Sequence, residues 1–75
     1  MTARDKLGYA FSLINWTELC RRYMPISRPY FALKLNGNVH QGILMELTDD
    51  ETRILQSALK DIAVKIYSAA ENLDK

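Results

Sequence analysis

The sequence predicts an all-α domain of four helices, in which the second and third form a helix-turn-helix and the fourth is long. Apolar residues recur at intervals of three and four over most of the chain, as on the buried face of a helix. Capping residues precede four such stretches, and a proline and a glycine end two of them. Because 75 residues are enough for one hydrophobic core, we expect one domain over residues 1–75.

The first two helices are predicted on either side of residue 15. Thr2 is placed to cap a helix over residues 3–14, whose apolar residues keep helical spacing throughout. Asn15 is a favourable N-cap for a second helix. This helix ends by Met24, since Pro25 lacks an amide hydrogen and disfavours helical geometry at the residue before it.

The third helix is predicted to begin after Ser27, which can cap it. Phe31 and Leu35 are four residues apart and form an inward-facing pair. Gly37 supplies a left-handed stop after Asn36. The second and third helices thus fall within residues 16–37.

A loop and a long helix complete the prediction. We expect a loop over residues 38–47, with its last part, residues 43–47, extended against the core. Thr48 and Glu51 then form a capping box for a helix over about residues 49–73. At 1.5 Å per residue this helix is on the order of 35 Å long, which is longer than the stretch that three short helices can cover. Part of its apolar stripe is therefore expected to contact a second subunit.

Positive charge is concentrated in the first half of the chain. Residues 1–40 carry six basic and two acidic side chains, a net charge of +4, whereas residues 41–75 carry four basic and seven acidic side chains, a net charge of −3. A basic first half suits a surface that faces phosphates, and an acidic second half is expected to face away from them.

A set of polar residues within and just after the helix-turn-helix segment is predicted to bind nucleic acid. In such a unit the second helix presents its outer face to the major groove, while basic residues and helix N-termini hold phosphates. Tyr30 and Lys34 are neighbours on that expected outer face, and both are predicted to be exposed. The full set is Arg21, Arg22, Ser27, Arg28, Tyr30, Lys34 and Asn38.

The same segment contains, in order, a leucine with a small residue, an apolar-Ser-Arg turn, a buried aromatic residue and a closing Asn-Gly. These are Leu19-Cys20, Ile26-Ser27-Arg28, Phe31 and Asn36-Gly37. The pattern resembles the phage repressor and Cro class of helix-turn-helix proteins. The resemblance implies DNA binding and a regulatory role.

A second resemblance covers about residues 14–66. It rests on Tyr23, Ser27-Arg28, Leu35-Asn36-Gly37-Asn38, Thr48-Asp49-Asp50-Glu51 and Ala58-Leu59-Lys60-Asp61-Ile62. These segments are similar to a family of short, uncharacterised proteins of gut bacteria and their phages. The resemblance implies a phage or mobile-element origin and no established activity.

Several classes of function are not expected. The sequence has no serine or cysteine matched with a histidine and no glycine-rich phosphate loop, so we expect no enzyme, no small-molecule substrate and no cofactor. His40 is the one histidine and has no ligands at metal-binding spacing, so we expect no metal. Cys20 stands alone, as is usual in a reducing compartment, and no apolar run spans a membrane. The expected location is the cytoplasm.

Two hypotheses on function follow. The first is a DNA-binding module that acts as a homodimer through its long C-terminal helix, because two half-sites are needed for useful affinity. The alternative is a small protein-interaction module, such as a phage-encoded inhibitor or adaptor, that keeps the same shape without binding DNA. Burial of Arg28 or Lys34 in intramolecular ion pairs would favour the alternative.

Overall fold

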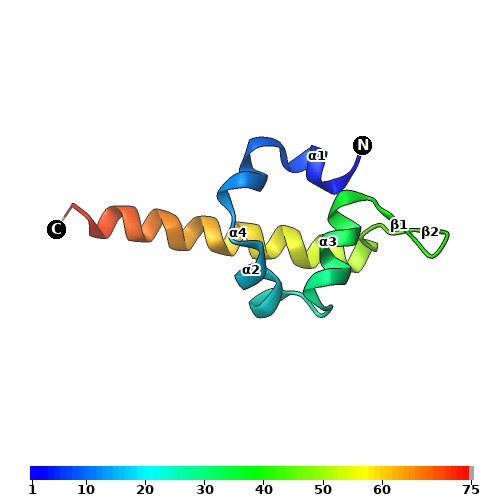
Figure 1. Ribbon diagram of the computed structural model, residues 1–75. Coiled ribbons are helices and arrows are strands. Elements are labelled where there is room, and N and C mark those ends of the chain that lie inside the picture. The colour runs from blue at the N-terminus through cyan, green and yellow to red at the C-terminus, as the bar shows by residue number, and fades with distance from the viewer. Residues whose placement is uncertain (75) are drawn as a thin grey trace.

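Three short helices gather around one half of a much longer fourth helix (Figure 1). The computed structural model describes residues 1–74, and within them the chain is mainly α-helical, as predicted. The elements in chain order are α1 (Ala3–Leu7), a 3₁₀ helix η1 (Gly8–Leu13), α2 (Trp16–Tyr23), α3 (Arg28–Asn36), β1 (Val39–His40), β2 (Ile43–Leu44) and α4 (Asp49–Asn72).

The N-terminal segment differs from the single helix predicted over residues 3–14. Thr2 and Asp5 form a capping box, in which each side chain accepts a hydrogen bond from the other residue's amide. The α-helix stops at Gly8, whose φ of 59° lies in the left-handed region that suits glycine. The chain then continues as η1. The apolar spacing runs on through the break, which is why the pattern did not reveal it.

The second and third helices begin and end close to the predicted residues. Asn15 caps α2 by accepting a hydrogen bond from the amide of Glu18 at 3.2 Å. Gly37 ends α3 in the left-handed conformation, with φ 64° and ψ 35°. Ser27 occupies the N-cap position of α3, but its side chain makes no capping hydrogen bond, contrary to the prediction.

Residues 38–47 contain a short hairpin in place of the predicted loop. Val39 pairs with Leu44, and His40 pairs with Ile43. The two residues between the strands both have positive φ, which matches the twist of a two-residue hairpin turn. Residues 43–47 are predicted to pack against the core. For β2 this prediction is wrong, because Ile43 and Leu44 are 65% and 55% exposed.

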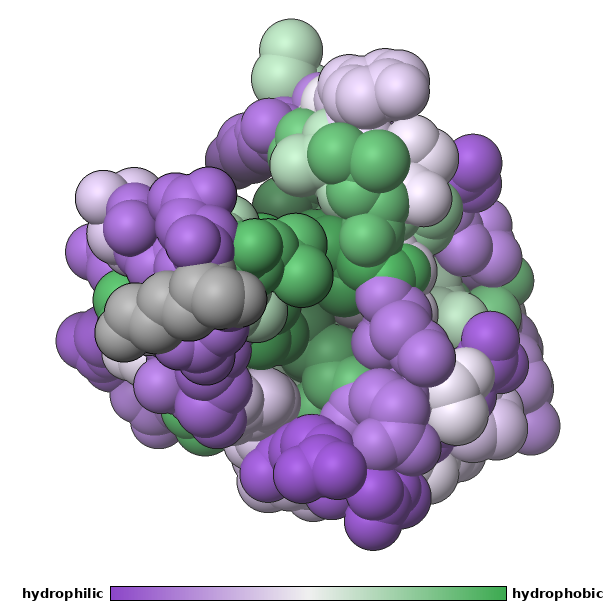
Figure 2. Space-filling model, turned by 90° about the vertical axis from the view of Figure 1, so that its left-hand side faces the viewer, coloured by the Kyte–Doolittle hydropathy of each residue, from purple (hydrophilic) through white to green (hydrophobic). Residues whose placement is uncertain are grey.

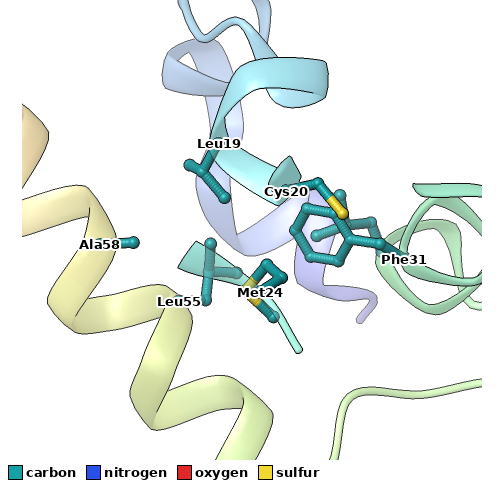
Figure 3. Close-up of a cluster of buried hydrophobic side chains, with 7 residues drawn as sticks. Leu19, Cys20, Met24, Phe31, Leu55 and Ala58 are labelled. Atoms are coloured by element: carbon teal, nitrogen blue, oxygen red, sulfur yellow. The ribbon is translucent and has the colours of Figure 1, made fainter. Parts of the chain in front are cut away.

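The hydrophobic core lies where α2 and α3 meet the first half of α4 (Figure 3). Phe31 and Leu19 are its largest fully buried side chains. Trp16 packs its ring edge-to-face against Phe31 at a centroid distance of 5.8 Å, and its Nε1 donates to the carbonyl of Phe11. The buried residues are Leu19, Cys20, Met24, Phe31, Leu35, Leu55 and Ala58.

The second half of α4 projects away from this core (Figure 1). Every residue from 63 to 74 is exposed. The described molecule is accordingly elongated, with principal extents of 54 × 23 × 19 Å. Within residues 1–74, no helix combines the length and the apolar character needed to cross a membrane.

Candidate functional site

Two of the predicted phosphate-binding arginines share one carboxylate on α2. Arg21 donates to Glu18 through Nε at 3.2 Å and Nη2 at 2.8 Å, and Arg22 donates to the same carboxylate through Nε at 3.1 Å. The hydrogen bonds from Arg21 and then Arg22 lower the pKa of Glu18 to about 2. Glu18 is thus ionised at neutral pH and offsets one of the two positive charges. Both arginine side chains remain 64% exposed.

Lys34 does not lie on the outer face of α3 as predicted. Its side chain is only 17% exposed, and its Nζ donates to both oxygens of Glu51 at 2.8 and 2.9 Å. On a helix Lys34 lies roughly 60° around from Phe31 and so flanks the inward face. The N-terminal turn of α4 occupies that flank and buries the pair.

Arg28 and Tyr30 of α3 contact two different elements, α2 and β1. Arg28 is exposed, and its Nε donates to Oγ1 of Thr17 at 2.8 Å, which joins the start of α3 to the start of α2. Tyr30 is 50% exposed and packs edge-to-face against His40 of β1 at 6.2 Å between ring centroids. The remaining predicted residues, Ser27 and Asn38, are both exposed.

The structure therefore brings the predicted residues together only in part. Thr17 and Arg21 are one turn apart on α2 and share a side of it, so Arg28, held by Thr17, lies on the same side as Arg21. Lys34 is separated from them by its burial against α4. Of the predicted basic residues, those that remain exposed are thus the arginines of α2 and the first residue of α3.

A polar cluster that the sequence did not predict ties α2 to the middle of α4. The hydroxyl of Tyr23 donates to Oδ2 of Asp61, and Nζ of Lys65 lies 3.0 Å from the same oxygen. These hydrogen bonds, first from Tyr23 and then from Lys65, lower the pKa of Asp61. Asp61 and Lys65 follow Tyr23 by 38 and 42 residues in the sequence, so no local pattern predicts this cluster.

The projecting half of α4 carries the clearest unpartnered surface among the described residues. Ile66, Tyr67 and Leu73 are 64%, 69% and 86% exposed. Viewed from the C-terminal end of α4, apolar residues line a hollow in the centre of the molecule's face (Figure 2). The predicted apolar stripe of the long helix thus continues beyond the part that the domain covers.

A groove of about 580 Å³ lies between α1, the segment after β2 and α4. Its apolar lining includes Leu7, Leu47 and Leu59, and Lys6 and Glu46 also border it. Nearby, α1 packs against α3. Within residues 1–74 there is no group of three histidine, cysteine or acidic side chains that could hold a metal ion.

These features define a small helical domain whose described surface combines paired charges with an exposed apolar helix. A family model described as Domain of unknown function (DUF5053) matches residues 3–73, and the chain belongs to this family. No curated protein and no solved structure matches the chain. The prediction of an uncharacterised family is thus confirmed.

Proposed function

We propose that the chain is a small protein-interaction module that binds its partner through the projecting half of α4. The observation that carries this proposal is the exposure of Ile66, Tyr67 and Leu73 on the same helix whose Leu55 and Ala58 are buried in the core. A contiguous apolar stripe that leaves its own domain is typical of a surface that another protein covers.

The energetics of a free helix support this proposal. A helical segment of about ten residues is marginal in water, because its few hydrogen bonds barely offset the entropy lost in ordering the backbone. Residues 63–74 are exposed and receive little cover from the rest of the described chain. Burying one large apolar side chain contributes about 1.5–3 kcal/mol. A partner that packs on this segment would therefore stabilise it.

The charges support the same proposal. Of the four cations predicted to hold phosphates, Lys34 is buried against Glu51, and Arg21 and Arg22 share Glu18. The affinity of a protein for duplex DNA of any sequence depends on the number of phosphates that its cations neutralise. Cations that are paired with carboxylates neutralise fewer phosphates, so these ion pairs lower that affinity. Burial of Lys34 in an intramolecular ion pair favours the interaction hypothesis over DNA binding.

Site-specific photo-crosslinking in the native host tests the proposal. A photoreactive phenylalanine analogue replaces Tyr67 in one variant and Tyr9 in a control, since Tyr9 is 81% exposed but lies on η1. We expect discrete crosslinked protein bands from position 67 and none of these bands from position 9. The absence of any band at position 67, with the variant expressed and folded, would reject the proposed function.

DNA binding is the second candidate, with a regulatory role and a phage or mobile-element origin. It is favoured by the placement of Arg21 and Arg28 on one side of α2. Basic residues beside the first turn of a second helix are typical of helix-turn-helix proteins. The resemblance of residues 19–37 to the phage repressor and Cro class supports this candidate.

Fluorescence anisotropy with duplex DNA at low salt tests the second candidate. If Arg21 and Arg28 hold phosphates, replacing either with alanine reduces the magnitude of the negative slope of log affinity against log salt by about 0.9. Arg53→Ala removes an exposed arginine of α4 and serves as the control. No binding at about 100 µM protein, the weak end of the non-specific range, would reject DNA binding.

We place either function in the cytoplasm. Cys20 is the one cysteine of the sequence, and its thiol is buried in the core. A buried thiol without a disulfide partner is usual for proteins of a reducing compartment.

A further inference from the structure

We infer that the partner of the projecting helix is a second copy of this chain, and that the two α4 helices pair antiparallel about a two-fold axis near Tyr67. This inference rests on the proposed function and names the partner of the same surface. It is carried by the spacing of the apolar residues, by the placement of small residues and by the charges at the two ends of the projecting segment.

The apolar residues of α4 form a seam with the spacing of a coiled coil. Intervals of three and four residues alternate along it, a mean period of 3.5, which keeps one face toward a partner helix. Leu59 and Ile62 at its inner end are half-buried by their own domain, whereas Ile66 and Ala69 are exposed. The seam comprises Leu59, Ile62, Ile66, Ala69 and Leu73.

An antiparallel register places large residues opposite small or complementary ones. When Ile66 of one copy faces Ala69 of the other, the two-fold axis repeats the contact, and Ile62 then faces Leu73. Large and small side chains that alternate across facing positions interdigitate without voids. Ala63 and Ala70 lie on one edge of the seam and fall opposite each other, so the two backbones can approach closely along that edge.

The charges select the antiparallel direction. The inner end of the projecting segment carries Lys60, and its outer end carries Glu71 and Asp74, all exposed. Antiparallel pairing sets Lys60 of each copy beside Asp74 of the other, on the edge that holds the alanines. In a parallel pair the acidic residues of the outer end lie 11 to 14 residues, roughly 16–21 Å, along the partner from Lys60, so this contact cannot form.

The shape of the molecule agrees with this direction. The three short helices surround only one half of α4, so antiparallel pairing of the other halves keeps the two domains at opposite ends (Figure 1). The tip of each helix then reaches the apolar hollow at the base of the other helix (Figure 2). Each copy thus covers the half of the partner's seam that the partner's own short helices leave exposed.

Sedimentation equilibrium with matched variants tests whether a second copy is the partner. Ile66 and Val64 are each 64% exposed, but Val64 lies on the opposite side of α4. Ile66→Glu is expected to weaken dimerisation at least about a hundredfold, since two buried isoleucines are lost, and Val64→Glu by less than about threefold. A monomer mass for the wild type up to about 1 mM, beyond the concentration range of useful self-association, overturns the inference.

Cysteine crosslinking tests the direction of pairing. In a Cys20→Ala background, we mix the Ala63→Cys and Ala70→Cys proteins under mild oxidation. The antiparallel pair gives a disulfide between residue 63 of one copy and residue 70 of the other. Neither variant alone should crosslink efficiently. The absence of this mixed disulfide in a mixture that is dimeric overturns the inference, because a parallel pair holds residues 63 and 70 about 10 Å apart along its axis.

Charge reversal gives an independent measure. Lys60→Glu and Asp74→Lys should each weaken dimerisation roughly three- to tenfold, because each exposed ion pair raises the association constant by up to about fivefold. The double variant should restore dimerisation. Restoration fails if the two residues do not meet, and this result also overturns the antiparallel arrangement.

The tests separate this inference from the proposed function. Crosslinks at position 67 to a different protein, together with a monomer mass, overturn the second copy as partner and leave the interaction surface in place. The absence of all crosslinks at position 67 removes the proposed function itself. A dimer that is sensitive to Ile66→Glu but forms no disulfide between residues 63 and 70 retains the surface and overturns the direction.

Discussion

Lys34 of α3 and Glu51 of α4 are joined by two hydrogen bonds, from Nζ to Oε1 at 2.8 Å and to Oε2 at 2.9 Å. Glu51 also accepts a hydrogen bond from the backbone amide of Thr48 at 2.9 Å. One carboxylate thus caps α4 and binds the cation of a neighbouring helix. The two side chains are 10% and 17% exposed, so the pair is shielded from solvent.

Removal of Lys34 is expected to destabilise the fold strongly. Lys34→Ala leaves the Glu51 carboxylate buried without its cation, which costs about 2–3 kcal/mol of unfolding free energy. Urea denaturation followed by circular dichroism measures this loss. Gln56→Ala, at an exposed site of α4, should change the free energy by less than about 0.5 kcal/mol. Equal stabilities for the two variants would contradict the role of the pair.

Stability is expected to fall in acid through the same residue. Burial raises the pKa of Glu51, but the hydrogen bonds from Lys34 and the backbone of Thr48 outweigh this effect and lower it below the ordinary value of 4.5. The unfolded state therefore binds the proton more tightly than the folded state. The stability from Glu51 is complete above about pH 5 and is lost as the pH falls through the lower, folded pKa.

Urea unfolding at a series of pH values tests this dependence. The wild type should lose unfolding free energy between about pH 5 and pH 2. Glu51→Gln should be less stable at neutral pH but should lose less on acidification, because it has no proton to bind at this site. Parallel curves for the two proteins would show that Glu51 does not contribute to the acid sensitivity.

Cys20 is expected to be unreactive in the folded protein. It is 3% exposed, its thiol donates to the carbonyl of Ile26 at 3.3 Å, and burial raises its pKa. Labelling with an aromatic disulfide reagent should be slow in buffer and fast in urea, whereas Val64→Cys in a Cys20→Ala background labels at once, because Val64 is 64% exposed. Cys20→Ala itself should cost about 1 kcal/mol. Rapid labelling of the native thiol would be inconsistent with this core position.

Gly37 is expected to tolerate no side chain because of two separate effects. Its φ of 64° is left-handed, and an added Cβ would lie 2.9 Å from Cγ2 of Thr2. Gly37→Ala should therefore cost more than the roughly 1 kcal/mol of left-handed strain alone. Thr2→Ser removes the methyl group and keeps the capping oxygen. If the same glycine substitution costs as much in the Thr2→Ser background, the close contact is not part of the cause.

The sequence predicts the helices well because their signals are local. Asn15, Gly37 and the capping box at Thr48 each act within one turn, and the helices begin or end at these residues. The break at Gly8 was missed because one glycine within apolar spacing does not distinguish a left-handed residue from a helical one. The hairpin was missed because its strands have only two residues each.

The candidate site was predicted less well, for a physical reason. The outer face of α3 was inferred from Phe31 and Leu35 alone, and that inference places Lys34 in solvent. Its burial depends on where the N-terminal turn of α4 packs, 17 residues further along the chain. The exposed stripe of α4 was predicted because helix length and apolar spacing are both visible in the sequence.

The continuity of α4 joins the folding of the domain to its association. Leu55 and Ala58, which hold the core together, lie on the same uninterrupted helix as the exposed Ile66 and Leu73. A ligand that holds the outer turns in helical form also favours the inner turns, and it binds the native state in preference to the unfolded chain. By mass action, the melting temperature should then rise with the concentration of that ligand. For a self-associating chain, dilution alone would lower it.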